Sequence, residues 1–169
     1  DWPGVQLVDD VAPHEKRKLR MLNGAHSLLA YGGLERGLTY VHEAVRDPVL
    51  RPLVSELMKD AGATLPAALQ VQVPDYAEAL LRRFENLELA HRLDQIAMDG
   101  SQKLPYRFVP TLRETGSQAV IAGMRAWISY CVSETAEGRA LNDPCASEIA
   151  SAVKQPDPVV PLSGLVGAE

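Results

Sequence analysis

Three polar side chains lie among the leucines of the segment KRKLRMLNGAHSLLAYGG, residues 16–33. On an α-helix with about 100° between successive residues, Lys18, Asn23 and His26 share one arc with those leucines. A partly desolvated lysine can act as a general base near neutral pH. Asparagine and neutral histidine can donate hydrogen bonds to a carbonyl or alkoxide oxygen. The three residues are therefore typical of a proton-transfer site that acts on an alcohol or a ketone.

Each of these residues also has an ordinary structural explanation. A single lysine on an apolar arc usually extends its ammonium group to solvent, because burying that group unpaired costs several kcal/mol. A buried histidine or asparagine usually has a hydrogen-bond partner in the core. The occurrence of all three on one arc favours the proton-transfer interpretation. The opposite arc, which we expect to face solvent, holds Lys16, Arg17, Arg20, Gly24 and Ser27.

The elements that position these residues are expected to be helices, and the fold class is predicted to be all-α. Apolar residues recur at helical spacing along the chain, whereas the alternation typical of strands is scarce. Asp10 and Pro13 are typical of the start of a first helix, which can run to the glycines at 32–33. Further helices are predicted over residues 34–47, 47–60, 74–86, 86–99, 117–136 and 142–153.

Proline and glycine are expected to interrupt these helices. Gly100 should end the helix that precedes it, and Pro105 and Pro110 should break the segment 101–114. The glycine-rich sequence GGLERG, residues 32–37, follows a predicted helix and does not match the GxGxxG pattern. The chain is therefore not expected to be a nucleotide-binding βαβ domain.

Composition restricts the class of protein further. The 169 residues are 46% hydrophobic and 23% charged, with a formal net charge of -5, which suits one globular domain and does not favour nucleic acid or an anionic membrane. No apolar run approaches the roughly 18 residues of a membrane-spanning helix, and no signal peptide is evident. The two cysteines, Cys131 and Cys145, do not form a metal-binding pattern. We expect a cytoplasmic protein without a metal.

Two separated segments resemble the polyol-specific long-chain dehydrogenases, the family of mannitol dehydrogenase and of the mannonate and fructuronate oxidoreductases. KLRMLNGAHS, residues 18–27, has the Lys-x4-Asn-x2-His spacing of that family's catalytic helix. QIAMDGSQKLPYR, residues 95–107, resembles the family's IAxDGSxKLPxR segment. The flanking sequences VDDVAPHEKRKLR and RFENLEL also fit, so the resemblance covers most of residues 7–110 in order.

The resemblance implies a metal-independent oxidoreductase that uses NAD or NADP. Residues 1–169 would be its helical catalytic domain, similar to the C-terminal domain of 6-phosphogluconate dehydrogenase. An N-terminal Rossmann domain would bind most of the cofactor and would lie outside this sequence, which begins without methionine like the interior of a longer polypeptide. The chain alone is therefore expected to have no dehydrogenase activity.

The resemblance also implies roles for individual residues. Lys18 would be the general base towards the substrate hydroxyl and the general acid in the reductive direction. Asn23 and His26 would position the substrate oxygen and stabilise the charge that develops on it. Lys103 matches a lysine that contacts substrate in the polyol branch, and Gln95 stands where that branch has an arginine that is a second substrate contact. Both would be substrate-binding residues, although without the guanidinium the contacts of the polyol branch do not carry over fully at Gln95.

The substrate class follows from the second segment. QIAMDGSQK is closer to the mannonate and fructuronate enzymes, which favours a sugar acid over a neutral polyol such as mannitol or arabinitol. Arg107 can bind a substrate carboxylate through two hydrogen bonds or form a structural ion pair, and its context favours the ion pair. The alternative of another class is a helical interaction domain without catalytic activity.

Overall fold

The computed structural model describes residues 10–168, and this part of the chain is all-α, as predicted. The only strand-like pairing among the described residues is a single antiparallel bridge between Tyr40 and Arg92. None of the described helices is both long and apolar enough to cross a lipid bilayer.

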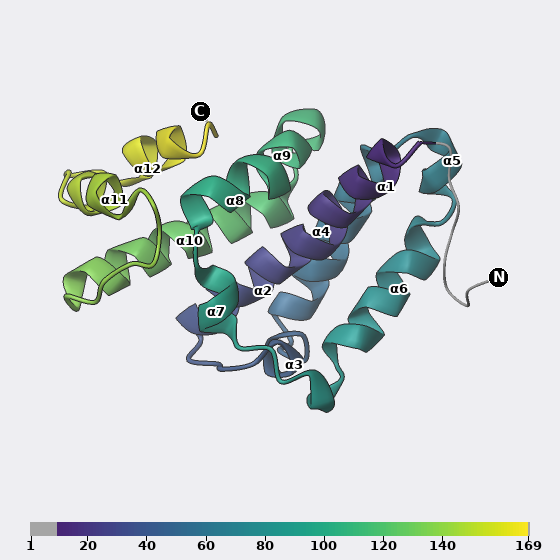
Figure 1. The fold of residues 1–169 in the computed structure, drawn as a ribbon, viewed down its shortest axis with the longest axis horizontal. Helices are drawn as coiled ribbons and strands as arrows, with labels where there is room; N and C mark the ends of the chain where they lie inside the picture. The colour runs from purple at the N-terminus through teal and green to yellow at the C-terminus, as the bar shows by residue number, and fades with distance from the viewer. Residues whose placement is uncertain (1–9, 169) are drawn as a thin grey trace.

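A long central helix organises the fold (Figure 1). It consists of α1 (Ala12–Arg17), a π-helical turn η1 (Lys18–Asn23) and α2 (Gly24–Glu35). Pro13 lies in the first turn, as predicted, whereas the N-cap residue is Val11 and not Asp10. The Asp10 carboxylate, one residue earlier, accepts a hydrogen bond from the Ala12 N–H at 3.0 Å. The helix continues two residues past the glycines at 32–33, to Glu35. These glycines permit close packing between helices: a Cβ on Gly33 would lie 2.5 Å from Leu93 Cδ1.

The other helices pack around this central one. They are α3 (Val41–Ala44), α4 (Leu50–Ala63), α5 (Ala67–Gln70), α6 (Val73–Phe84), the 3-10 helix η2 (Leu87–Leu89), α7 (Leu93–Ala97), α8 (Gly100–Arg107), α9 (Val109–Thr115), α10 (Gln118–Ala136), α11 (Ala146–Val153) and α12 (Val159–Leu165). α4, α6, α10 and α11 confirm four of the predicted helices. Proline in the first turn of α6 and the Ser117 hydroxyl, which caps α10, explain two of the starts.

α2 is buried on nearly every side, because α4, α7 and α10 all pack against it. Gly24 and Ser27 are buried, so the expectation that they lie on a solvent-facing arc is wrong. A helix at the centre of a bundle has no solvent face, and an amphipathic pattern is therefore not required of it.

Two predicted helices, over 34–47 and 86–99, are largely absent. In the first, residues 34–35 only complete α2 and Val41–Ala44 forms the short α3; the second contains η2 and the short α7. The backbone groups of residues 39–41 pair instead with those of 91–93: the Leu93 N–H donates to the Thr39 carbonyl at 2.9 Å, and the Val41 N–H donates to the His91 carbonyl at 3.0 Å. This pairing satisfies groups that a helix would otherwise have bonded internally.

The prediction that Gly100 ends a helix is also wrong, because Gly100 begins α8. A Cβ at this position would lie 2.5 Å from Trp127 Nε1 and 2.6 Å from the Tyr31 hydroxyl oxygen, so the residue permits close packing at the helix start. Segment 101–114 is helical apart from one residue between α8 and α9. Pro105 lies within α8 near its end, and Pro110 lies in the first turn of α9, where a missing N–H is tolerated.

Candidate functional site

The π-helical turn contains two of the three residues singled out on the central helix. It runs from Lys18 to Asn23, and the N–H of the next residue, Gly24, donates to the carbonyl of Leu19, five residues earlier. In this geometry residues five apart lie about one turn above one another, so Lys18 and Asn23 come to nearly the same side of the helix. A regular α-helix would separate them by about 140°. Such turns often occur at functional sites.

The Lys18 side chain is exposed and has no hydrogen bond or ion pair with the described residues. By contrast, Arg20 has only 12% of its side chain exposed and forms a 2.7 Å ion pair with Glu114. The expectation that Lys18 is more buried than the arginine is therefore wrong. Because it is exposed and has no partner among the described residues, the Lys18 ammonium group is available to a ligand.

His26 lies on α2 beyond the π turn and is largely buried. Its ring centroid lies 4.7 Å from that of Phe84 and 6.3 Å from that of His91. Burial, and then the positive charges of His91, Arg107 and Arg83, lower the pKa of His26 to about 4. His26 is therefore neutral near pH 7 and can donate a hydrogen bond to a substrate oxygen without carrying a charge.

The low pKa of His26 makes a prediction about stability. An unfolded histidine with a pKa of 6.5 binds a proton that folded His26 does not bind until the pH is about 4. The free energy of unfolding should therefore be at its full value above pH 6.5 and should decrease, by up to about 3 kcal/mol, as the pH falls to 4. Urea unfolding of the chain at pH 7.5 and pH 5 would measure this. His26→Gln should reduce the difference, whereas His14→Gln should not; an unchanged difference in His26→Gln would contradict the prediction.

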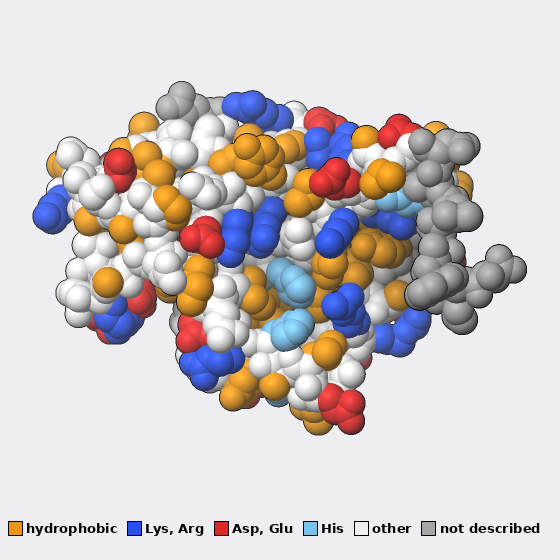
Figure 2. All heavy atoms as spheres, in the orientation of Figure 1, with side chains coloured by type: hydrophobic (Ala, Val, Ile, Leu, Met, Phe, Trp, Pro, Cys, Tyr) orange, Lys and Arg blue, Asp and Glu red, His pale blue; other side chains and the backbone are white. Residues whose placement is uncertain are grey.

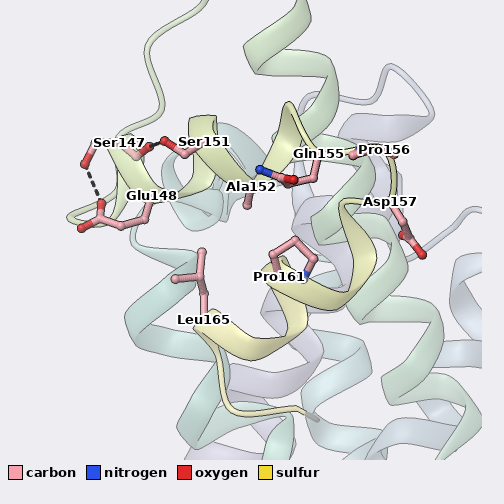
Figure 3. Close-up of a pocket in the computed structure, with 9 residues that line it drawn as sticks. All are labelled: Ser147, Glu148, Ser151, Ala152, Gln155, Pro156, Asp157, Pro161 and Leu165. Atoms are coloured by element: carbon pink, nitrogen blue, oxygen red, sulfur yellow. Dashed lines mark hydrogen bonds between the residues drawn. The ribbon is translucent and has the colours of Figure 1, made fainter.

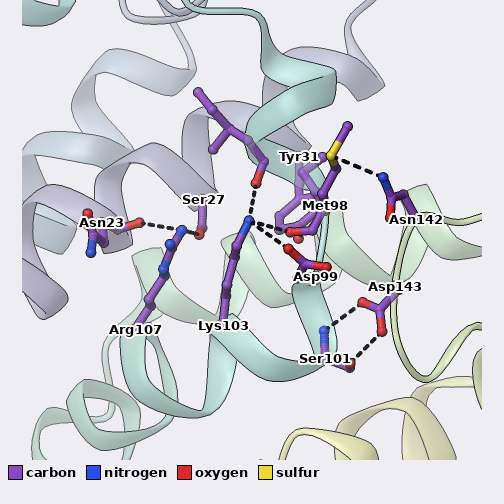
Figure 4. Close-up of polar contacts among 12 residues, drawn as sticks. Asn23, Ser27, Tyr31, Met98, Asp99, Ser101, Lys103, Arg107, Asn142 and Asp143 are labelled. Carbon is purple, nitrogen blue, oxygen red and sulfur yellow. Dashed lines mark hydrogen bonds and ion pairs between the residues drawn. The ribbon is translucent and has the colours of Figure 1, made fainter.

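α8 presents two basic residues to the central helix. Lys103 and Arg107 are four positions apart and so lie on one face of α8, which packs against η1 and α2. Arg107 Nη1 donates to the Ser27 hydroxyl at 2.9 Å and to the Asn23 carbonyl at 3.5 Å (Figure 4). The structure thus brings Arg107 into contact with the residue that ends the π turn. Ser27, which the sequence pattern placed on the solvent arc, is the main partner of the guanidinium group.

The Arg107 guanidinium has no carboxylate partner among residues 10–168, so the structural ion pair that its sequence context favours is not formed there. The side chain is partly buried, and this burial lowers the pKa of Arg107. Only Nη1 has a hydrogen-bond partner in the described part of the chain, and Nη2 and Nε remain available. A partly buried cation with free donors is a suitable group for binding an anion.

Lys103 is held by backbone groups at the end of α7. Its ammonium donates to the Met98 carbonyl at 2.6 Å and to the Ile96 carbonyl at 3.5 Å, and it lies 3.6 Å from the Asp99 carboxylate (Figure 4). These contacts fix the position of Lys103 on the same face of α8 as Arg107.

Gln95 stands apart from the other predicted residues. It is exposed in the first turn of α7, where its backbone N–H donates to the Asp94 carboxylate at 2.8 Å. No hydrogen bond or ion pair within the described residues joins its side chain to the other predicted site residues.

Figure 2 shows lysine, arginine and histidine side chains together near the middle of one face of the molecule.

A hollow of about 860 Å³ lies elsewhere, between α11 and α12 (Figure 3). Its lining includes Glu148, Ser151, Pro161 and Leu165 and none of the predicted site residues. Residues 10–168 contain no group of three His, Cys, Asp or Glu side chains arranged to hold a metal ion. The candidate site is the region where η1, α2 and α8 meet, because these packed helices carry Lys18, Asn23, His26, Lys103 and Arg107.

This fold and site define a helical domain with polar and basic residues on two packed helices, and comparison with known proteins shows its family. The family model described as "Mannitol dehydrogenase C-terminal domain" matches residues 10–160. The chain belongs to the mannitol dehydrogenase family and corresponds to its C-terminal domain.

Individual relatives agree with this assignment. D-mannonate oxidoreductase of Escherichia coli is 39% identical over 180 residues, which cover 99% of this chain and 37% of the relative. Mannitol 2-dehydrogenase of Phaeosphaeria nodorum is 35% identical, over 97% of this chain and 31% of the relative. The Pseudomonas fluorescens mannitol 2-dehydrogenase structure, a ternary complex with NAD and D-mannitol, superposes with a TM-score of 0.79 at 27% identity, covering 98% of this chain and 40% of that one. The chain thus spans 31–40% of the length of these relatives.

Proposed function

We propose that this chain is the substrate-binding and catalytic domain of a nicotinamide-dependent oxidoreductase that interconverts a keto sugar acid and its aldonate, of the fructuronate and mannonate type. The observation that carries the substrate class is the partly buried Arg107 guanidinium, which has no carboxylate partner among the described residues and contacts the π turn through Asn23. A substrate carboxylate would supply the missing anion. The similarity to a D-mannonate oxidoreductase supports the same class.

A carboxylate would fit this arginine for physical reasons. A planar guanidinium can donate two parallel hydrogen bonds to a carboxylate, and such bonds are stronger than those between neutral groups. The fixed contact of Nη1 with Ser27, at 2.9 Å, reduces the side-chain freedom that binding would otherwise have to remove. Lys103, on the same face of α8, would contact hydroxyl groups of the bound sugar acid.

The proposed acid–base chemistry belongs to the central helix. In the oxidative direction Lys18 would accept the proton of the substrate hydroxyl, and in the reductive direction it would return a proton to the ketone oxygen. Asn23, on nearly the same side of the π turn, and neutral His26 would donate hydrogen bonds to that oxygen. Because Lys18 is exposed in this chain, further parts of the protein or the substrate would have to exclude water around it.

The nicotinamide nucleotide, NAD or NADP, would take up or supply the hydride. The glycine-rich segment does not form a phosphate-binding loop, because Gly32 and Gly33 are packed inside α2. We therefore propose that an N-terminal Rossmann domain of the same polypeptide holds the cofactor, and that this chain alone is inactive.

A neutral polyol such as mannitol is the second candidate substrate. The mannitol 2-dehydrogenase relative, 35% identical, favours it, as does the presence of Lys103, which resembles a substrate contact of the polyol branch. The two candidates differ in their need for Arg107, because a neutral polyol has no carboxylate to pair with it.

A substrate screen of the purified full-length protein tests the proposal. With NAD or NADP, kcat/KM for aldonates and keto sugar acids should exceed that for mannitol and arabinitol by at least about 100-fold, because a polyol would leave the partly buried Arg107 guanidinium unpaired. A preference for mannitol would contradict the substrate class. Absence of activity with every sugar acid and polyol would contradict the oxidoreductase assignment and favour a helical interaction domain.

A further inference from the structure

The linker between α10 and α11 holds the start of α8. The Asp143 carboxylate accepts a hydrogen bond from the Ser101 N–H at 2.9 Å and another from the Ser101 hydroxyl (Figure 4). The neighbouring Asn142 accepts a hydrogen bond from the Asp99 N–H at 2.9 Å through its carbonyl, and its side-chain amide donates to the Met98 sulfur at 3.2 Å. A segment more than forty residues away in sequence therefore fixes residues 98–101.

This part of the chain needs such support from outside. Asp99 has a left-handed backbone conformation, with φ of 57°, which is uncommon for a residue other than glycine. The first N–H groups of any helix lack partners inside the helix, and no side chain at the N-cap of α8 supplies one. Ser101 is 5% exposed, so its N–H would remain unsatisfied without Asp143.

Residues 98–101 lie next to both basic residues of the candidate site, Lys103 and Arg107. The carbonyl of Met98 is the nearest acceptor of the Lys103 ammonium, at 2.6 Å. Lys103 and Arg107 follow Ser101 on α8, which has only eight residues. A shift of the helix start would therefore move Lys103 and Arg107 relative to the central helix.

We propose that Asp143 is a positioning residue for substrate binding, acting through Ser101 to set Lys103 and Arg107. This inference rests on the proposed function. The position calls for a carboxylate, because each of its two oxygens faces an N–H that can only donate: one accepts from the Ser101 N–H, and the other accepts from the Cys145 N–H at 2.9 Å and from the Ser101 hydroxyl. An amide would direct its own NH2 group at one of these N–H groups.

Asp143→Asn in the full-length enzyme tests the inference. The KM for the sugar acid should rise about 10-fold, while kcat stays within about 2-fold, because substrate binding changes and the proton-transfer residues do not. Hydrogen–deuterium exchange of residues 100–107 should become faster. Ser101→Ala, which removes only the hydroxyl contact, should raise KM about 3-fold and should add nothing to Asp143→Asn.

Asp157→Asn is the matched control. Its carboxylate accepts a hydrogen bond from the Val159 N–H at 3.0 Å at the start of α12, but α12 carries none of the proposed site residues. This variant should lose thermal stability without a change in KM. An equal effect of Asp157→Asn and Asp143→Asn on KM would overturn the inference, because it would show only general destabilisation.

The remaining outcomes separate the inference from the proposed function. An unchanged KM in Asp143→Asn, together with loss of turnover in Lys18→Ala, would overturn the positioning role and leave the proposed function intact. A wild-type protein inactive on sugar acids and polyols would overturn both. If Asp143→Asn does not fold, Ser101→Ala decides: a raised KM supports the inference, and an unchanged KM overturns it.

Discussion

Lys18→Ala in the full-length protein is expected to lower turnover by about 10²- to 10⁴-fold, the range that a general acid–base group contributes. The side chain lies at the start of the π turn, on nearly the same side as Asn23, and it has no hydrogen bond or ion pair with the described residues. Its removal should therefore affect proton transfer and little else. Steady-state kinetics in both reaction directions, with fluorescence titration of the cofactor, would measure the effect, and cofactor binding should be unchanged.

Lys16→Ala is the control for this change, because Lys16 lies on the same helix and has structural partners. Its ammonium donates to the Thr64 carbonyl at 2.7 Å and lies 4.0 Å from the Glu114 carboxylate. We expect Lys16→Ala to change stability slightly and to leave turnover near that of the wild type. If Lys18→Ala also kept near-normal turnover, the catalytic assignment of the central helix would have to be abandoned.

Arg107→Ala should reduce kcat/KM for the sugar acid at least about 30-fold, which corresponds to about 2 kcal/mol of lost charge pairing with the substrate. Any slow activity on mannitol should change much less, because mannitol has no carboxylate. Arg107→Lys should have an intermediate effect, since lysine keeps the charge but cannot donate two parallel hydrogen bonds. Parallel measurements on a sugar acid and on the matching polyol would give the ratio.

Ser27→Ala separates binding from structural support. It removes the hydroxyl that accepts a 2.9 Å hydrogen bond from Arg107 but leaves the guanidinium in place. We expect a small rise in KM for the sugar acid and a modest loss of thermal stability.

For Arg107→Ala, an equal loss of activity on the sugar acid and on the polyol would disprove the carboxylate-binding role of Arg107.

Much of the fold could be predicted from local patterns. The spacing of apolar residues, together with caps and first-turn prolines, correctly indicated α4, α6, α10, α11 and most of the central helix. α4, α6 and α11 form because each segment can bury one apolar side while its backbone bonds internally, whereas α2 is buried on nearly every side. Local patterns could not predict the conformation of the short segments 39–41 and 91–93, because their backbone groups form hydrogen bonds with each other and these segments are distant in sequence.

For the candidate site, the residue types and their spacing can be read from the sequence: Lys18, Asn23 and His26 lie on one segment, and Lys103 and Arg107 lie four positions apart on another. Their arrangement in space depends on how the helices pack. The π turn reduces the angle around the helix axis between Lys18 and Asn23. The packing of α8 on the central helix places Arg107 beside Ser27, and no carboxylate among residues 10–168 pairs with its guanidinium. The contact of Asp143 with Ser101 likewise joins distant segments. Periodicity describes one helix at a time, whereas burial and hydrogen-bond partners depend on which helices pack together.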